Sequence, residues 1–177
     1  MEILEIKDLE TLAKKRVPKM FFDYVNSGSW TETTYNENVS DFQKIKLRQR
    51  VAIDMSNRTL ETKMINQPVS MPVAIAPTGL TGMQRADGEI LAAQAAEEFG
   101  IPYTLSTMSV CSIEAVAEKT KKPFWFQLYV MKDKKFMERL IDRAKEAKCS
   151  ALVLTLDLQL LGQRHKDLRN GLSTPPK

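Results

Sequence analysis

Polar side chains end four short apolar segments in the second half of the sequence. The segments begin near Val73, Tyr103, Phe124 and Ala151, at intervals of 30, 21 and 27 residues. The residues at or just after their carboxyl ends are Pro77, Thr78, Gly79, Ser106, Thr107, Gln127, Tyr129, Thr155 and Asp157. Any one of them could simply begin a loop, but ligands of parallel α/β sheets bind at this edge. The four ends together therefore indicate a binding site.

The chemistry of these groups favours one kind of ligand. Most of them are neutral hydrogen-bonding side chains, which suit an uncharged polar heterocycle better than a bare phosphate. Gly79 has no side chain, so the backbone there could approach a flat ring closely. No GxGxxG follows a predicted strand and no GxxxxGK occurs. Their absence argues against a Rossmann-type nicotinamide domain and against a phosphate-binding P-loop.

Composition and charge exclude several other classes of protein. The 177 residues carry 26 Lys and Arg against 22 Asp and Glu, and the net charge of +4 is too mild to indicate nucleic-acid binding. His165 is the sole histidine, and Cys111 and Cys149 form no CxxC pair, so we expect neither a metal site nor a disulfide framework. No apolar run reaches the roughly 18 residues of a membrane span, and the charged N-terminus is unlike a signal peptide. We expect a cytoplasmic protein.

Helices are predicted for most of the first third of the chain. They cover residues 8–16, 19–27 and 31–41, and short extended pieces follow at 45–50 and 62–65. Asp8 is expected to cap the first helix, whereas Pro18 opens the second and Gly28 closes it. Apolar residues on one side of the first two helices predict that these two helices pack against other parts of the fold.

The remainder of the chain alternates between predicted strands and predicted helices. Strands are predicted at 72–76, 103–106, 124–129 and 151–156, with helices at 86–99, 112–119 and 133–148 between them. Ser112 and Asp133 are capping residues, and Gly100 followed by Pro102 ends the first of these helices. The pattern predicts an α/β fold with a parallel sheet, which is either doubly wound or part of a (β/α) barrel. A complete eight-stranded barrel needs about 250 residues, so 177 residues exclude one.

Several ordered motifs resemble one family, the FMN-dependent 2-hydroxy acid dehydrogenases and oxidases. The resemblance covers almost the whole chain, and its end at 162–177 is most similar to the L-lactate dehydrogenase branch. The motifs are Phe22-Asp23-Tyr24 followed by Ser27-Gly28, Leu47-Arg48-x-Arg50, Pro72-Val-Ala-Ile-Ala-Pro-Thr-Gly79, Trp125-Phe-Gln-Leu-Tyr129, Thr155-x-Asp157 and Gly162-x-Arg164-x-x-Asp167-x-Arg169-Asn170. The resemblance implies a TIM-type (β/α) barrel limited here to about its first four strands. Residues 1–70 would form an N-terminal helical cap with short strands, and 71–177 the first half of an FMN-binding barrel.

The resemblance also implies roles for individual residues. The cofactor-binding residues would be Pro77, Thr78, Gly79, Ser106, Gln127 and Thr155, with the backbone of the first three against the flavin. Tyr24 and Arg164 would hold the substrate carboxylate, since arginine can grip it with two parallel hydrogen bonds. Tyr129 would contact the substrate and steady charge that develops on oxygen, and Asp157 would orient a catalytic histidine.

That histidine is the point at which this sequence departs from the family. The family's base, a second arginine, a flavin-contacting lysine and the phosphate-binding segment lie late in the barrel, beyond the part that this sequence resembles. His165 lies in the charged stretch 163–167 and does not match the base, so we interpret it as a solvated loop residue. The resemblance therefore implies a partner, either a complementary C-terminal half or a second copy of the chain.

Two functions remain open at this point. The first is an FMN-dependent oxidoreductase that oxidises a small L-2-hydroxy acid, most simply L-lactate to pyruvate, with the missing half supplied in trans. The second is a non-catalytic truncated product of a split or decayed gene, at most a residual flavin-binding or interaction module. An opened barrel would expose strand edges and apolar faces, which favours self-association or a partner. Some members of the family associate with membranes, so the resemblance also allows peripheral contact with the inner membrane.

Overall fold

The computed structural model describes residues 2–158 and 160–172 of the chain. The chain folds as two compact units, one that runs to Ser56 and resumes at Leu160, and another that begins at Asn57 and ends before Leu160. These bounds differ from the predicted division at residue 70. The hairpin at 62–69 belongs to the same unit as the parallel sheet, and the chain rejoins the first unit after its last strand. The division into a helical cap and a half-barrel stays a prediction.

The first unit is helical, as the sequence predicts. Its helices are α1 (Ile6–Arg16), α2 (Lys19–Val25), α3 (Thr33–Lys44) and α8 (His165–Arg169). Asp8 lies at the third position of α1 and Glu5 is the N-cap, which corrects the predicted cap. The Asp8 Oδ2 atom nevertheless accepts the backbone N–H groups of Leu4 and Glu5, at 2.9 and 3.2 Å. These bonds lower the pKa of Asp8.

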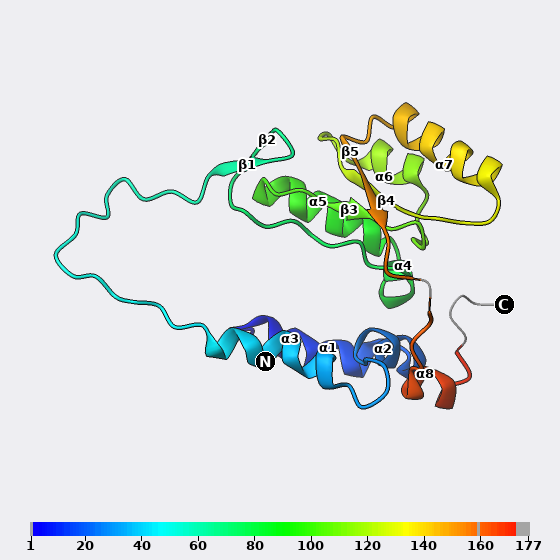
Figure 1. Cartoon of the computed structure of the whole chain (residues 1–177), viewed down its shortest axis with the longest axis horizontal. Helices are drawn as coiled ribbons and strands as arrows, with labels where there is room; N and C mark the ends of the chain where they lie inside the picture. The colour runs from blue at the N-terminus through cyan, green and yellow to red at the C-terminus, as the bar shows by residue number, and fades with distance from the viewer. Residues whose placement is uncertain (1, 159, 173–177) are drawn as a thin grey trace. The chain divides into compact units, whose positions relative to one another are not determined.

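The second unit contains a parallel sheet preceded by a small hairpin (Figure 1). The hairpin pairs β1 (Thr62–Met64) with β2 (Gln67–Val69), and the sheet has the order β3 (Thr104–Leu105), β4 (Trp125–Tyr129), β5 (Ala151–Thr155). The predicted strand at 72–76 is reduced to a single parallel bridge between Ile75 and Tyr103. Among the described residues of this unit, the helices that accompany the strands are α4 (Thr81–Gln84), α5 (Gly88–Phe99), α6 (Ile113–Lys119) and α7 (Lys134–Glu146). Strand and helix alternate in the predicted β-α order.

Local sequence signals fix the ends of the helices that follow the strands. The Ser112 hydroxyl accepts the backbone N–H of Ala115 at 3.1 Å, and the Asp133 carboxylate accepts that of Phe136 at 3.0 Å. Gly100 takes the left-handed conformation with φ of 70° at the end of α5. Each of these caps was predicted. The Ser112 and Asp133 side chains satisfy backbone N–H groups that a helix start leaves unpaired, and glycine adopts the left-handed conformation at a helix end without strain.

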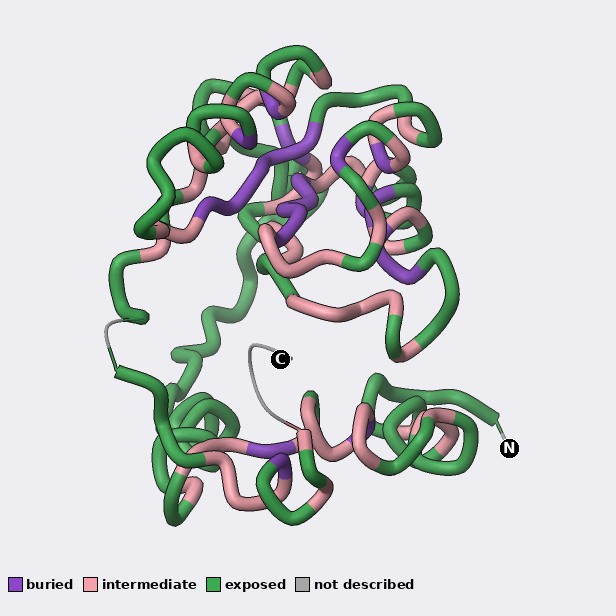
Figure 2. Tube along the Cα trace, turned by 90° about the vertical axis from the view of Figure 1, so that its right-hand side faces the viewer, coloured by how far each residue is buried: buried purple, intermediate pink, exposed green. Residues whose placement is uncertain are grey.

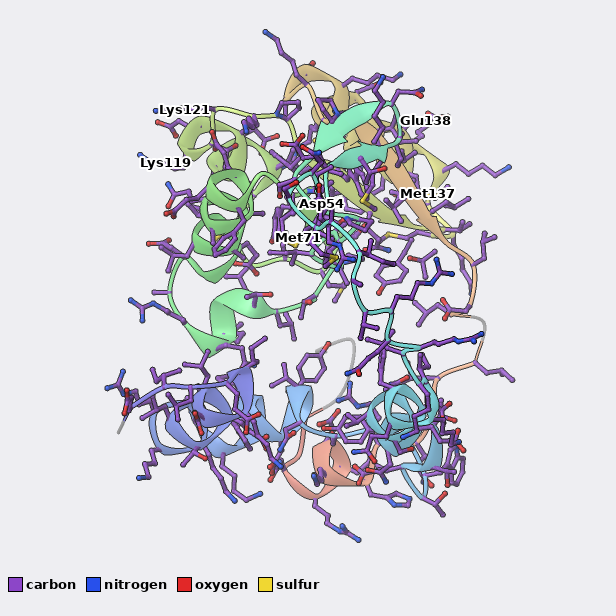
Figure 3. All side chains as sticks on the ribbon, turned by 90° about the vertical axis from the view of Figure 1, so that its left-hand side faces the viewer. Asp54, Met71, Lys119, Lys121, Met137 and Glu138 are labelled. Carbon is purple, nitrogen blue, oxygen red and sulfur yellow. The ribbon has the colours of Figure 1, made fainter. Side chains whose placement is uncertain are left out.

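The core of the second unit lies between one face of the sheet and helices α5, α6 and α7. Buried residues gather along the strands and on the helix faces toward them (Figure 2). On β4, Phe126 and Leu128 belong to this core, whereas Trp125, Gln127 and Tyr129 point to the opposite face. The lysines that end α6 are solvated, and Figure 3 shows Lys119 and Lys121 at the outer surface.

The edge strand β5 presents apolar side chains to solvent. It pairs only with β4 among the described residues, and its sheet is open rather than closed into a barrel. Leu152 and Leu154, which share the face of the core, are 49% and 48% exposed, and Leu156 beyond the strand is 67% exposed. No helix of the described residues is long and apolar enough to cross a bilayer.

The pairing of β4 with β5 provides a matched test of the difference in burial between these two strands. Leu128 and Leu154 are directly paired, yet Leu128 is 4% exposed and Leu154 is 48% exposed. We expect Leu128→Ala to lower the free energy of unfolding by about 3 kcal/mol, because it leaves a cavity in the core. We expect Leu154→Ala to cost about 1 kcal/mol or less, because much of its surface already contacts water. Urea unfolding of both variants measures the difference, and equal losses would show that β5 is covered in solution.

Candidate functional site

A chain of hydrogen bonds links the carboxyl ends of the three parallel strands. The Ser106 hydroxyl donates to Gln127 Oε1 at 3.3 Å, and Gln127 Nε2 donates to Thr155 Oγ1 at 2.7 Å. Ser106 and Gln127 are 2% and 1% exposed. Gln127, in the middle of β4, therefore links Ser106 after β3 to Thr155 at the end of β5, and all three are predicted cofactor residues.

Thr107 fixes the orientation of the Gln127 side chain. Its backbone N–H donates to Gln127 Oε1 at 3.2 Å, and its hydroxyl donates to the Gln127 carbonyl oxygen at 2.5 Å. With Oε1 accepting two bonds, the amide NH2 group faces β5. That group has two hydrogens, and the bond to Thr155 uses one of them. The arrangement can present a neutral donor to a ligand at this end of the sheet.

Tyr129 and Asp157 lie at the same end of the sheet. Tyr129 is the last residue of β4, is half-buried, and pairs in register with Thr155. Asp157 follows β5 by two residues and is exposed. Both predicted catalytic residues are thus within the second unit, at the carboxyl ends of adjacent strands.

The loop that carries Pro77, Thr78 and Gly79 is tied to the loop that follows β3. The Leu80 backbone N–H donates to the Met108 carbonyl oxygen at 2.9 Å, and the Thr81 hydroxyl donates to the Thr78 carbonyl oxygen at 3.1 Å. Leu80 has a φ of 57°, a left-handed conformation that is uncommon outside glycine. Thr78 is exposed.

Tyr24 and Arg164, the predicted substrate-binding pair, lie together in the first unit. The Arg164 guanidinium carbon is 4.6 Å from the centre of the Tyr24 ring, a cation–π contact. Arg164 Nη2 donates to the Tyr24 carbonyl oxygen and, at 3.2 Å, to that of Ser27. These bonds satisfy carbonyl groups at the end of α2, where a cation also complements the helix dipole.

A buried carboxylate holds Arg164 from the other side. Asp167 is 2% exposed, and its Oδ2 atom lies 3.0 Å from Arg164 Nε in an ion pair. Burial raises the pKa of Asp167, although the charge of Arg164 acts in the opposite direction. The sequence motif contains Asp167, but nothing in the sequence alone assigned it a role. Its burial and its contact with Arg164 identify it as part of the candidate site.

His165, interpreted from the sequence as a loop residue, begins helix α8 instead. It is half-buried, its ring lies 6.1 Å from that of Trp30 in an edge-on arrangement, and its Nε2 atom contacts Gln163 Oε1 at 3.3 Å. The helix forms because the N–H groups of Leu168 and Asn170 bond back to the carbonyls of Arg164 and Lys166. Both ring contacts are to residues of its own unit.

One cavity of about 260 Å³ lies away from all these residues. The β1–β2 hairpin, the end of α5 and residues 122–124 line it, so it is at the amino ends of the strands. No predicted site residue lines this cavity, and parallel sheets bind ligands at the opposite edge. The candidate site is therefore the set of polar side chains near the carboxyl ends of the strands. Within the described residues no cluster of three His, Cys, Asp or Glu side chains could hold a metal ion.

The chain belongs to the FMN-dependent dehydrogenase family. The family model matches residues 13–177, which confirms the resemblance to the FMN-dependent 2-hydroxy acid dehydrogenases. The strand-end groups fit the cofactor of this family in kind, because Ser106, Gln127 and Thr155 form a neutral, oriented set of donors and acceptors.

The chain is similar to L-lactate dehydrogenases of two Acinetobacter species. It is 49% identical to the protein of Acinetobacter baylyi over 175 residues, which is 99% of this chain and 46% of that protein. It is 50% identical to that of Acinetobacter baumannii over 168 residues, or 95% of this chain and 44% of that protein. The chain therefore spans about half the length of the curated relatives that it matches.

Solved structures show the same partial coverage. A soluble mutant of the membrane-associated (S)-mandelate dehydrogenase from Pseudomonas putida superimposes with a TM-score of 0.92 at 35% identity, covering 99% of this chain and 50% of that one. The structure of the monotopic membrane protein (S)-mandelate dehydrogenase superimposes with a TM-score of 0.92 at 34% identity, and this chain covers 47% of it. The α/β fold thus matches about half of these structures.

The raised pKa of Asp167 predicts a pH dependence of stability. Because the folded chain holds this proton more tightly than the unfolded chain, the contribution of Asp167 to stability is full below its ordinary pKa of 3.8 and falls as the pH rises through the raised pKa. Asparagine does not titrate, so the stability of the wild type relative to Asp167→Asn should decrease from about pH 3 toward neutrality. Urea unfolding of both proteins across this range measures it. If the stability of the wild type relative to Asp167→Asn instead increased with pH, the ion pair with Arg164 would outweigh the effect of burial on the pKa of Asp167.

Proposed function

We propose that this chain supplies the flavin platform and part of the substrate site of an FMN-dependent oxidoreductase. Its proposed substrate is a small L-2-hydroxy acid, and its proposed reaction is the oxidation of L-lactate to pyruvate. The observation that carries the proposal is the hydrogen-bonded set Ser106, Gln127 and Thr155, which runs from the end of β3 across β4 to the end of β5. The 49% identity to an L-lactate dehydrogenase supports this choice of substrate.

The cofactor would bind across the strand ends. Pro77, Thr78 and Gly79 would lie against the ring with their backbone, since Thr78 is exposed and Gly79 has no side chain. Ser106, Gln127 and Thr155 would hydrogen-bond its polar edge and so tune its affinity for electrons. When bound, FMN accepts the two electrons that leave the hydroxyl-bearing carbon of the substrate.

The substrate would be held through its carboxylate. Arg164 offers the Nη1 donors of a guanidinium that Asp167 and α2 already orient, and its side chain is 26% exposed. Tyr24, stacked on that guanidinium, would add a phenol hydroxyl. Tyr129 would donate to the substrate oxygen as charge develops there. Asp157 would orient and stabilise the family's histidine base, which lies outside the part of the family that this chain matches.

The fold proposed is the first half of a TIM-type barrel that a partner completes. The chain spans about half of its relatives, and β5 ends the sheet with Leu152 and Leu154 half exposed. A complementary C-terminal half that carries the base would cover this edge, and a second copy of the chain is the other candidate. We propose a cytoplasmic location, with peripheral contact to the inner membrane. The membrane-associated (S)-mandelate dehydrogenase, at 35% identity, supports such contact.

A non-catalytic product is the second candidate function. The exposure of Leu152, Leu154 and Leu156 is compatible with this candidate as well, because an unpaired apolar edge promotes aggregation of a chain without its partner. Mixing the chain with a separately produced C-terminal half of a related L-lactate dehydrogenase distinguishes the two. Lactate-dependent reduction of a dye by the mixture supports the oxidoreductase, and a mixture that stays inactive supports the non-catalytic product.

Replacement of Gln127 tests the flavin platform. We expect Gln127→Leu to raise the Kd for FMN about tenfold, because it removes the oriented amide and leaves Ser106 and Thr155 without their partner. Gln94→Leu is the matched control, since Gln94 also donates a hydrogen bond, at 3.0 Å to the Lys119 carbonyl oxygen, on a helix away from the strand ends. Flavin fluorescence titration gives both constants, and an equal Kd for the two variants would contradict the assigned role.

Tyr129 is expected to act on turnover rather than on cofactor binding. In a reconstituted active complex, Tyr129→Phe should slow turnover by about a hundredfold and change the Kd for FMN by less than about twofold, because it removes one hydroxyl aimed at the substrate. Steady-state kinetics and flavin titration on the same preparation measure the two effects. Equal losses of turnover and flavin affinity would exclude this role.

A further inference from the structure

The carboxylate of Glu89 is buried between two loops at the carboxyl ends of the strands. Glu89 lies in the first turn of α5 and is 0% exposed. Its Oε1 atom accepts the backbone N–H of Gly82 at 2.9 Å and that of Val110, also at 2.9 Å. Gly82 belongs to α4, directly after the loop with Thr78 and Gly79, and Val110 belongs to the loop after β3. One oxygen atom therefore joins the start of α4, which follows the first loop, to the second loop.

Helix α4 lies too close to the loop after β3 and to the start of α5 for side chains at Gly82 and Gly88. A Cβ atom added to Gly82 would lie 2.6 Å from Val110 Cβ and 3.0 Å from Glu89 Oε2. A Cβ atom added to Gly88 would lie 2.8 Å from the Thr81 carbonyl oxygen. Glycine at both positions permits the contact on which the Glu89 bonds depend.

The backbone beside these contacts adopts uncommon conformations. Leu80 and Asp87 have φ values of 57° and 58°, in the left-handed region. Such residues persist where the surrounding structure fixes them. Here the fixing contacts are the bond from Leu80 to Met108 and the two bonds to Glu89.

We propose that Glu89 is a positioning residue that fixes the loop of Thr78 and Gly79 against the loop that follows Ser106, and so sets the face that the flavin meets. This inference rests on the proposed function, since it assumes that these loops bind FMN. Glu89 would touch neither cofactor nor substrate. It acts through Gly82 and Val110, whose N–H groups it holds.

The charge of Glu89 strengthens the clamp. Burial alone raises the pKa of the carboxyl, but the N–H bonds from Val110 and Gly82 outweigh it and leave the pKa below its ordinary value. An ionised acceptor makes shorter and stronger hydrogen bonds than a neutral one. The thiol of Cys111 faces the same carboxylate, and burial and that contact raise the pKa of Cys111. A neutral acceptor should therefore hold the two loops less firmly.

Amide hydrogen exchange on the full chain tests the clamp without relying on FMN. We expect Glu89→Ala to speed exchange at residues 80–83 and 107–111 by about tenfold, and Glu89→Gln, which retains one acceptor oxygen, to give an intermediate rate. Glu97→Gln is the control, because Glu97 accepts the N–H of Lys121 at 2.9 Å near the other end of α5. Unchanged exchange of both loops in Glu89→Ala would overturn the clamp, as would equal acceleration by Glu97→Gln.

FMN titration of the same proteins tests the consequence for the cofactor. The Kd should rise about tenfold in Glu89→Ala and less in Glu89→Gln, with a shifted visible flavin spectrum, and should be unchanged in Glu97→Gln. If the wild type binds no FMN, the proposed function fails and the flavin role of Glu89 fails with it, while exchange still decides whether the clamp exists. If Glu89→Ala does not fold, Gly82→Ala forces the loops apart by a separate route and should raise the Kd similarly. A Gly82→Ala variant with wild-type affinity would overturn the proposal.

Discussion

The second unit of this structure depends on the need to satisfy a buried polar group near the carboxyl ends of its parallel strands. Gln127 is almost fully buried, so an unpaired amide there would cost about 1–3 kcal/mol. Ser106 and Thr107, which directly follow β3, and Thr155, which ends β5, supply its partners. Satisfying one amide thus aligns β3, β4 and β5. The same bonds orient the donors that we assign to the flavin.

A second constraint comes from the apolar face of β5. Helices α5, α6 and α7 cover the core side of the sheet as far as β4, whereas Leu152 and Leu154 stay half exposed. The relatives that this chain matches are about twice its length, and the solved structures are covered to about half. Family membership and the exposed edge both support the proposal of a half-barrel that supplies the flavin platform.

Many of the helix ends and strands could be predicted from the sequence, because the signals that specify them are local. Ser112, Asp133 and Gly100 fixed helix ends, and apolar runs marked β3, β4 and β5. The predicted cap of the first helix was wrong: Glu5 is the N-cap, and Asp8 bonds to the backbone from the first turn of α1. The roles of Asp167 and Glu89 were not readable, because each depends on groups brought together only by folding. Spacing along the chain does not encode such contacts.

Size-exclusion chromatography of the chain with added FMN tests the central claim most directly, through the visible absorbance of the flavin. The account predicts a discrete protein peak that carries flavin absorbance, in a ratio close to one FMN per chain. Such a peak means that the strand-end platform forms and binds without further residues. A discrete, folded peak without flavin would contradict the account, because the hydrogen-bonded set at the strand ends would then be present and unable to hold the cofactor. An aggregated peak without flavin would contradict it as well, and would favour the non-catalytic product.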